Sequence, residues 1–81
     1  MLDELKTAKK VVGIKQLRRA LTDQTAELVF LAKDADPALT EPLLDRCRAN
    51  GVEVVTGVTM AELGKACGIS VGAAAAAILR R

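Results

Sequence analysis

The feature that most constrains this chain is an unbroken apolar run, Leu28 to Ala32, near the middle of 81 residues. A strand that is apolar at every position is buried on both faces, so the sheet that contains it needs a covering layer on each side. Segments with helical spacing and short apolar segments alternate on either side of this run. We therefore expect an α/β fold, with helices packed on a central sheet, formed by one domain over residues 1–81.

The remaining elements follow from spacing and from capping signals. We predict helices over residues 2–9 and 15–21 and strands over residues 11–12 and 52–55. Thr40 can cap a further helix that carries Pro42 in its first turn, where the missing N–H of proline costs little. Thr59 and Glu62 form a capping box, which predicts the start of a last short helix.

The alanine-rich tail, residues 73–77, has two interpretations. Propensity alone favours a helix. The alternative is a strand whose small side chains lie under closely packed helices.

Several kinds of chemistry are excluded by the residues present. The chain has no histidine, which excludes a histidine-based catalytic triad and makes a zinc site on Cys47 and Cys67 untenable. Both cysteines are expected to be small buried hydrophobes. Gly64 and Lys65 lack the other residues of a phosphate-binding loop. We expect a protein that is not an enzyme and that holds no cofactor or metal.

Asp34 and Asp36 follow the central strand, at the end of a sheet where α/β proteins often bind ligands. Two carboxylates could hold magnesium, but without a phosphate-binding motif they make a weak metal site. The favoured interpretation is turn chemistry, with Asp36 held extended by Pro37.

The charge is unevenly distributed along the chain. Residues 1–20 carry six basic and two acidic side chains, a balance of +4, whereas residues 21–81 have a balance of −2. The basic part is either a surface that faces an anion or an ordinary solvated helix face. No apolar run reaches the ~18 residues of a membrane helix and no leader is evident. Nothing suggests a large apolar patch, so we expect a cytoplasmic monomer that does not engage a membrane.

The segment after Val12 predicts a binding site. Gly13 ends a short apolar segment, and the helix that follows presents free backbone N–H groups at the positive end of its dipole. Longer donors come from Lys15, Gln16, Arg18 and Arg19. Such a site suits an anionic ligand that also offers hydrogen-bond acceptors on the edges of its bases. RNA is the first candidate.

A second feature is the loop over residues 68–72, in which glycines flank Ile69 and Val71. Exposed aliphatic side chains there could cap an unstacked base. The alternative is that both side chains enter the core.

Three segments together resemble the L-seven-Ae ribosomal protein family, in particular its small bacterial members of the YbxF type. These segments are VGIKQLRRAL, LVFLAKDADP and ELGKACGISVGAAAAAI, and the resemblance covers residues 3–79. It implies a three-layer α-β-α sandwich around a mixed four-stranded sheet. It also implies that the alanine-rich tail is a strand.

Family members bind kink-turn RNA through a pattern of glycine, any residue, asparagine, glutamate, two residues and lysine. Lys15 stands at the asparagine position, Gln16 at the glutamate position and Arg19 at the lysine position, and bacterial members tend to carry Lys-Gln there. Ser70 replaces the glutamate that the family places between two aliphatic residues of the loop. The resemblance implies RNA contacts from Gly13, Ile14, Lys15, Gln16, Arg18, Arg19, Lys33, Asp34, Ile69, Ser70, Val71 and Gly72.

The implied partner is a structured RNA containing a kink-turn, and the ribosome is one candidate assembly. A kink-turn bends a duplex at a three-nucleotide bulge flanked by sheared G·A pairs, which leave guanine O6 and N7 accessible. Lysine and amide groups can donate to those acceptors. The alternative is a protein–protein interaction module that keeps the fold and has lost RNA binding.

Overall fold

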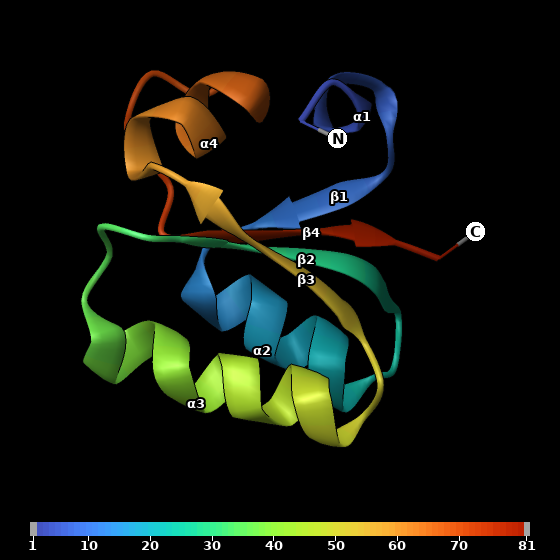
Figure 1. Cartoon of the computed structure of the whole chain (residues 1–81). Coiled ribbons are helices and arrows are strands. Elements are labelled where there is room, and N and C mark those ends of the chain that lie inside the picture. Colours follow the sequence, from blue (N-terminus) through green and yellow to red (C-terminus); the bar gives the residue numbers. More distant parts are fainter. Residues whose placement is uncertain (1, 81) are drawn as a thin grey trace.

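The computed structural model describes residues 2–80 (Figure 1), so Met1 and Arg81, the ends of the expected domain, lie outside the described residues. The chain runs α1 (Glu4–Thr7), β1 (Lys10–Val12), α2 (Ile14–Thr22), β2 (Ala26–Ala32), α3 (Pro37–Ala49), β3 (Glu53–Val58), α4 (Met60–Ala66) and β4 (Ala75–Leu79).

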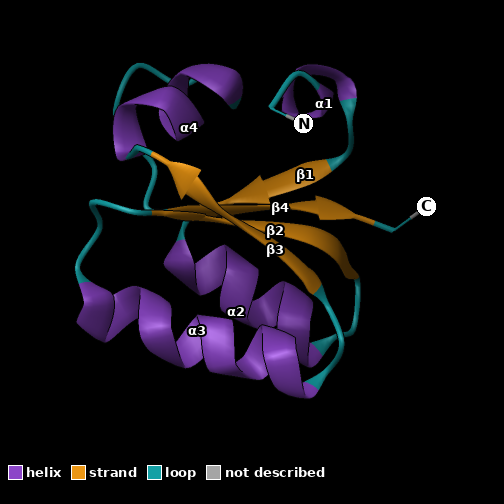
Figure 2. Ribbon diagram, in the orientation of Figure 1, coloured by secondary structure: helices purple, strands orange, loops and turns teal. Residues whose placement is uncertain are grey.

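The four strands form one sheet in the order β1-β4-β2-β3. β4 pairs antiparallel with both β1 and β2, whereas β2 pairs parallel with β3, so the sheet is mixed. Helices α1 and α4 cover one face and helices α2 and α3 cover the other (Figure 2). The expected three-layer α-β-α sandwich with a mixed four-stranded sheet is confirmed.

Strand β2 divides the interior into two cores because successive side chains point to opposite faces. Leu28 and Phe30 pack under α1 and α4, while Val29 and Leu31 pack under α2 and α3. Each of these four side chains is at most 9% exposed. This double burial explains why the segment is apolar at every position.

The alanine-rich tail is a strand, and its place in the sheet explains why helix propensity does not decide its structure. β4 lies between β1 and β2, so it supplies the hydrogen-bonding partners of both neighbours. Ala76 lies beside Phe30 in the register, and the alanine leaves room for the ring. Ala75, Ala76 and Ala77 are fully buried.

The sequence misplaced the start of α3. The helix begins at Pro37 and its cap is Asp36, whose Oδ1 accepts a hydrogen bond from the Ala38 N–H at 2.9 Å. Thr40 is therefore not the cap, and Pro42 lies in the second turn rather than the first. Pro37 fits the first helical position because its N–H would have no intrahelical partner there.

Other boundaries differ by a few residues. α1 is shorter than the expected helix over residues 2–9, because Ala8 is extended and Lys9 accepts a sheet hydrogen bond from Leu79. β3 extends to Val58, beyond the expected end at residue 55. The capping box at Thr59 is confirmed. Within residues 2–80, no helix has both the length and the apolar character needed to cross a membrane.

Candidate nucleic-acid interface

The candidate site lies at one edge of the sheet, on the left of Figure 1, where β1, β2 and β3 end and β4 begins. Helices α2, α3 and α4 all start at this edge. Backbone hydrogen bonds of 2.8–2.9 Å join the segments there, from Gly13 to Ala75, from Ala32 to Ala74 and from Lys33 to Val58. These contacts bring the start of α2 next to the loop that precedes β4.

The first turn of α2 presents hydrogen-bond donors. Its N-cap is Gly13, which has a φ of 105° and ψ of 158° and provides no side-chain cap. The first turn contains no acidic residue, and Lys15 and Gln16 are exposed on it. The uncapped N–H groups and the positive end of the helix dipole therefore point toward solvent together with two long donors.

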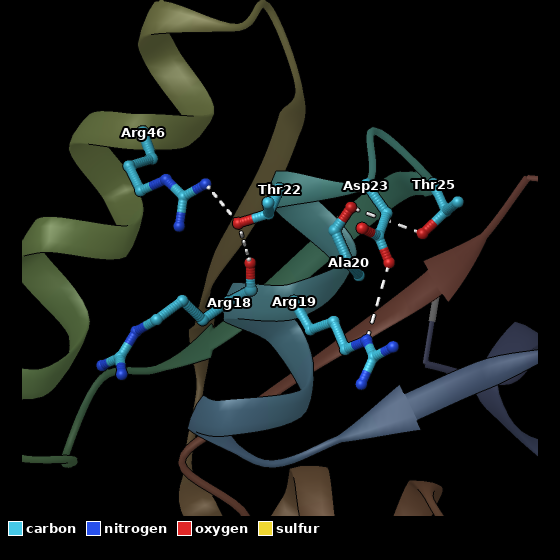
Figure 3. Close-up of polar contacts among 7 residues, drawn as sticks. All are labelled: Arg18, Arg19, Ala20, Thr22, Asp23, Thr25 and Arg46. Carbon is cyan, nitrogen blue, oxygen red and sulfur yellow. Dashed lines mark hydrogen bonds and ion pairs between the residues drawn. The ribbon is translucent and has the colours of Figure 1, made fainter.

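Two rows of side chains follow α2, because residues three and four apart lie on the same side of a helix. Gln16, Arg19 and Asp23 form the row on the β1 side, where they line a groove with Val11. Arg18 and Thr22 lie on the α3 side (Figure 3), and Lys15, three positions before Arg18, belongs to the same row by helical spacing.

The sequence-predicted contact Arg19 is held by an ion pair. Its Nε lies 3.7 Å from Asp23 Oδ2, and the two side chains are 82% and 54% exposed. An exposed pair of this kind contributes about 0–1 kcal/mol. A phosphate can therefore replace the Asp23 carboxylate at little cost.

The loop over residues 68–72 is exposed at the same edge. Ile69 is 39% exposed and Val71 is 69% exposed, so neither side chain is buried in the core. Ser70 and Gly72, also predicted as contacts, are exposed beside them. The structure thus favours the alternative in which the aliphatic side chains are available to a ligand.

Packing against α4 fixes the position of this loop. A Cβ on Gly64 would overlap the Val71 carbonyl oxygen, and a Cβ on Gly72 would lie 3.2 Å from the Met60 Cβ. The Ala73 N–H donates to the Met60 carbonyl at 3.0 Å. The loop can approach α4 this closely because both contact positions are glycine.

The segment after β2 supports the loop indirectly. Asp34 Oδ1 accepts a hydrogen bond from the Met60 N–H at 2.7 Å, so this carboxylate holds the first residue of α4. A carboxylate at the start of a helix is also favoured by the dipole. With Asp36 capping α3, both carboxylates serve helix starts, a role that the turn interpretation did not include. Lys33 is exposed beside them.

The start of α4 also holds a strongly hydrogen-bonded carboxylate. Glu62 Oε1 accepts from the Thr59 N–H at 2.9 Å, and Thr59 Oγ1 accepts from the Glu62 N–H at 3.1 Å. The hydrogen bond from the Thr59 backbone lowers the pKa of Glu62 most. The Thr59 side chain and the nearby Lys33 ammonium lower it further, while Asp34 and partial desolvation act in the opposite direction.

The two cysteines lie in separate cores. Cys47 packs with α2 and α3, and Cys67 packs with α1 and α4. Burial raises the pKa of both thiols, partly offset by Arg46 for Cys47 and by Lys10 for Cys67. Both are buried hydrophobes, as the sequence predicted, and neither is an activated thiolate.

The sequence analysis missed the roles of Gly64 and Met60 in positioning the loop. One signal was available for Gly64. A glycine inside a helix costs about 1 kcal/mol relative to alanine, so its presence within α4 indicates a close approach by another segment. No comparable signal marked Met60, because its hydrogen bonds to the loop and to Asp34 use backbone atoms.

Sequence comparison identifies the family. The model of the ribosomal protein L7Ae/L30e/S12e/Gadd45 family matches residues 2–81. The chain belongs to this family. Among similar L7Ae-family proteins, RNA-binding protein YbxF of Geobacillus stearothermophilus is 45% identical over 94% of this chain and 93% of its own length. The large ribosomal subunit protein eL8 of Halobacterium salinarum is 37% identical over 83% of this chain and 57% of its own length.

Solved structures show the same L7Ae-type fold. A 15.5kD RNA binding protein of Giardia lamblia superposes with a TM-score of 0.89 and 30% sequence identity, covering 99% of this chain and 71% of that protein. A Bacillus halodurans protein of unknown function superposes with a TM-score of 0.87 at 24% identity, covering 98% of this chain and 83% of that one. The second match supports the fold alone.

Proposed function

We propose that this protein binds RNA and that its edge site recognises a kink-turn. The observation that carries this proposal is the meeting of two unlike surfaces at one edge: the donor-rich first turn of α2 and the exposed aliphatic loop over residues 68–72. A kink-turn offers a matching pair of features, accessible guanine edges and an unstacked bulge base. Family membership and relatives named as RNA-binding proteins support RNA as the ligand.

The α2 turn reads the guanine edges of the sheared pairs. Lys15 Nζ and the Gln16 side-chain amide donate to guanine O6 and N7. Gly13 lets the RNA approach the backbone closely, because it has no side chain at the start of the helix. Arg19 exchanges its Asp23 partner for phosphates across the kink.

The loop binds the unstacked base. Ile69 and Val71 provide an apolar surface on which a base can pack, and unstacked bases are the features that RNA-binding proteins most often read. The contacts from Gly64 and Met60 hold this surface in place before RNA arrives. A positioned loop binds with less ordering cost than a mobile one.

Lys15 and Gln16 stand where the family has asparagine and glutamate, and this changes how hydrogen bonds and charge contribute to RNA affinity. Gln16 accepts hydrogen bonds through a neutral carbonyl, which binds guanine N–H groups more weakly than a carboxylate does. Lys15 adds a positive charge and hence a counterion-release contribution. We therefore expect binding that depends more steeply on salt than that of a family member with Asn-Glu.

A gel shift at two salt concentrations tests the proposal. The purified protein is titrated with a kink-turn RNA and with a control RNA that lacks the bulge and the G·A pairs. Selective binding to the kink-turn is expected. Equal binding to both RNAs would contradict kink-turn recognition, and binding to neither would favour the interaction-module alternative. The eL8 relative makes a ribosomal RNA kink-turn the first natural sequence to test.

Two substitutions test the mapped site. Gln16→Ala and Arg19→Ala should each weaken kink-turn binding by roughly 1–3 kcal/mol, the cost of losing a base contact or a charged contact. Glu27→Ala, an exposed change on β2, is the control. Unchanged affinity in both α2 variants would show that the RNA binds elsewhere.

A further inference from the structure

The α3 side of α2 carries basic side chains beyond those that the proposed kink-turn contacts use. Lys15, Arg18 and Thr22 follow one another along this side by helical spacing. Arg46 of α3 reaches Thr22 in the same row (Figure 3). The three α2 positions span about 10 Å along the helix at 1.5 Å per residue. We call these four residues the α2–α3 row.

Hydrogen bonds fix the far end of the row. Arg46 Nη2 donates to Thr22 Oγ1 at 3.1 Å, and Thr22 Oγ1 donates to the Arg18 carbonyl at 3.1 Å. The hydroxyl proton is thereby used, and the oxygen that faces Arg46 acts as an acceptor. Arg46 is half-buried and thus held against α2, while its guanidinium retains further N–H donors for another partner.

The arginines of this row form no ion pair within residues 2–80. Within residues 2–80, the single ion pair joins Arg19 to Asp23 on the opposite side of α2, so neither Arg18 nor Arg46 has a carboxylate within 4 Å there. Thr22, the partner of Arg46, is neutral. The acidic residue Glu41 of α3 faces a different groove, beside Thr56 of β3.

We propose that the α2–α3 row binds the phosphate backbone of an RNA stem that leaves the kink and runs along α2. The inference rests on the proposed function, because Lys15 belongs both to the first turn and to the row. Successive phosphates of one strand of an RNA stem lie a few ångströms apart along its axis, so a row of ~10 Å can meet more than one of them. A phosphate suits the free arginine donors, which match its oxygens geometrically.

Salt dependence measured on kink-turn RNAs of different stem length tests this proposal. Each stem is lengthened or shortened separately, and log K is plotted against log salt concentration. Arg46→Gln should reduce the slope by about one unit for the RNA whose long stem lies on the row, and should weaken binding a few-fold at low salt. With that stem shortened, wild type and variant should have the same slope.

Two variants control for loss of charge and loss of structure. Arg48→Gln removes an exposed charge from the same helix, but about 200° away from Arg46, and should leave the slope unchanged. Arg46→Lys keeps the charge and should restore most of the slope.

The outcomes separate the two proposals. If the salt-dependence slope of Arg46→Gln equals that of wild type with every RNA, the α2–α3 row does not bind the stem. The kink-turn site would still stand if Gln16→Ala weakened kink-turn binding. If wild type does not prefer the kink-turn, but Arg46→Gln still lowers the slope with long duplexes, the proposed function fails and the row remains.

Discussion

The first turn of α2 and the loop over residues 68–72 lie at the same edge of the sheet, but different parts of the chain hold them. Local geometry shapes the α2 turn, since Gly13 begins the helix and accepts the Leu17 N–H at 3.0 Å, and one backbone hydrogen bond from the Gly13 N–H to the Ala75 carbonyl ties it to the sheet. The loop depends on α4 and, through the Met60 N–H, on Asp34, which is 26 residues from Met60. Changes to α2 should therefore act locally, whereas distant changes should move the loop.

The largest expected effect comes from the glycine beneath the loop. Gly64→Ala should improve helix propensity by about 1 kcal/mol, yet the added methyl group overlaps the Val71 carbonyl. Because backbone must shift, we expect a net loss of about 2 kcal/mol of unfolding free energy, together with weaker RNA binding. Urea unfolding and the gel shift measure the two effects.

The control for this change is Gly57→Ala, since a methyl group there meets no atom within 4 Å. It should alter stability and binding much less. A Gly64→Ala protein that is more stable than wild type and binds RNA normally would show that α4 does not hold the loop.

An intermediate effect is expected at the start of α2. Gly13→Ala places a side chain at a φ of 105°, a region that costs about 1–3 kcal/mol for residues other than glycine. Gly51→Ala is a matched variant, because Gly51 also has a positive φ of 67° but lies after α3, away from the site. Both should lower stability in urea unfolding, and only Gly13→Ala should lower RNA affinity.

Equal losses of RNA affinity in the two variants would mean that the effect of Gly13 is one of general stability. The first turn of α2 would then not act on RNA binding independently of the stability of the fold.

The smallest effect concerns the pH dependence of α4. The hydrogen bonds from Thr59 lower the pKa of folded Glu62 below the ordinary value of 4.5. Its contribution to stability is therefore fully present above about pH 4.5 and is lost as the pH falls through the lower, folded pKa. Glu62→Gln should reduce the unfolding free energy at neutral pH and should converge with wild type in acid.

Urea unfolding of both proteins between pH 7 and pH 2.5 measures this difference. Glu41→Gln, on α3, is the control for loss of an exposed carboxylate. A stability difference between Glu62→Gln and wild type that does not change with pH would contradict the contribution of the ionised carboxylate.

Local patterns predicted several elements because the deciding interactions lie within a few residues. The capping box joins Thr59 to Glu62, and the apolar run at β2 reports its burial on both faces. The start of α3 was misjudged for a related reason. Two prolines, Pro37 and Pro42, and two possible caps, Asp36 and Thr40, lie close together there. Asp36 is the cap because proline is favoured at the first helical position, which Pro37 occupies.

The sequence by itself determined the alternation of helices and strands, the buried central strand and the basic first turn of α2. These depend on side-chain periodicity and on local hydrogen bonds. Residue propensities and spacing alone left three points open, although the family resemblance implied the first: that the alanine-rich segment is a strand, that Ile69 and Val71 are exposed, and that Gly64 supports their loop. The tertiary structure decided them. Each of these depends on contacts between segments distant in sequence: β4 needs partners on both sides, and the loop lies where Met60 and Gly64 allow backbone to approach.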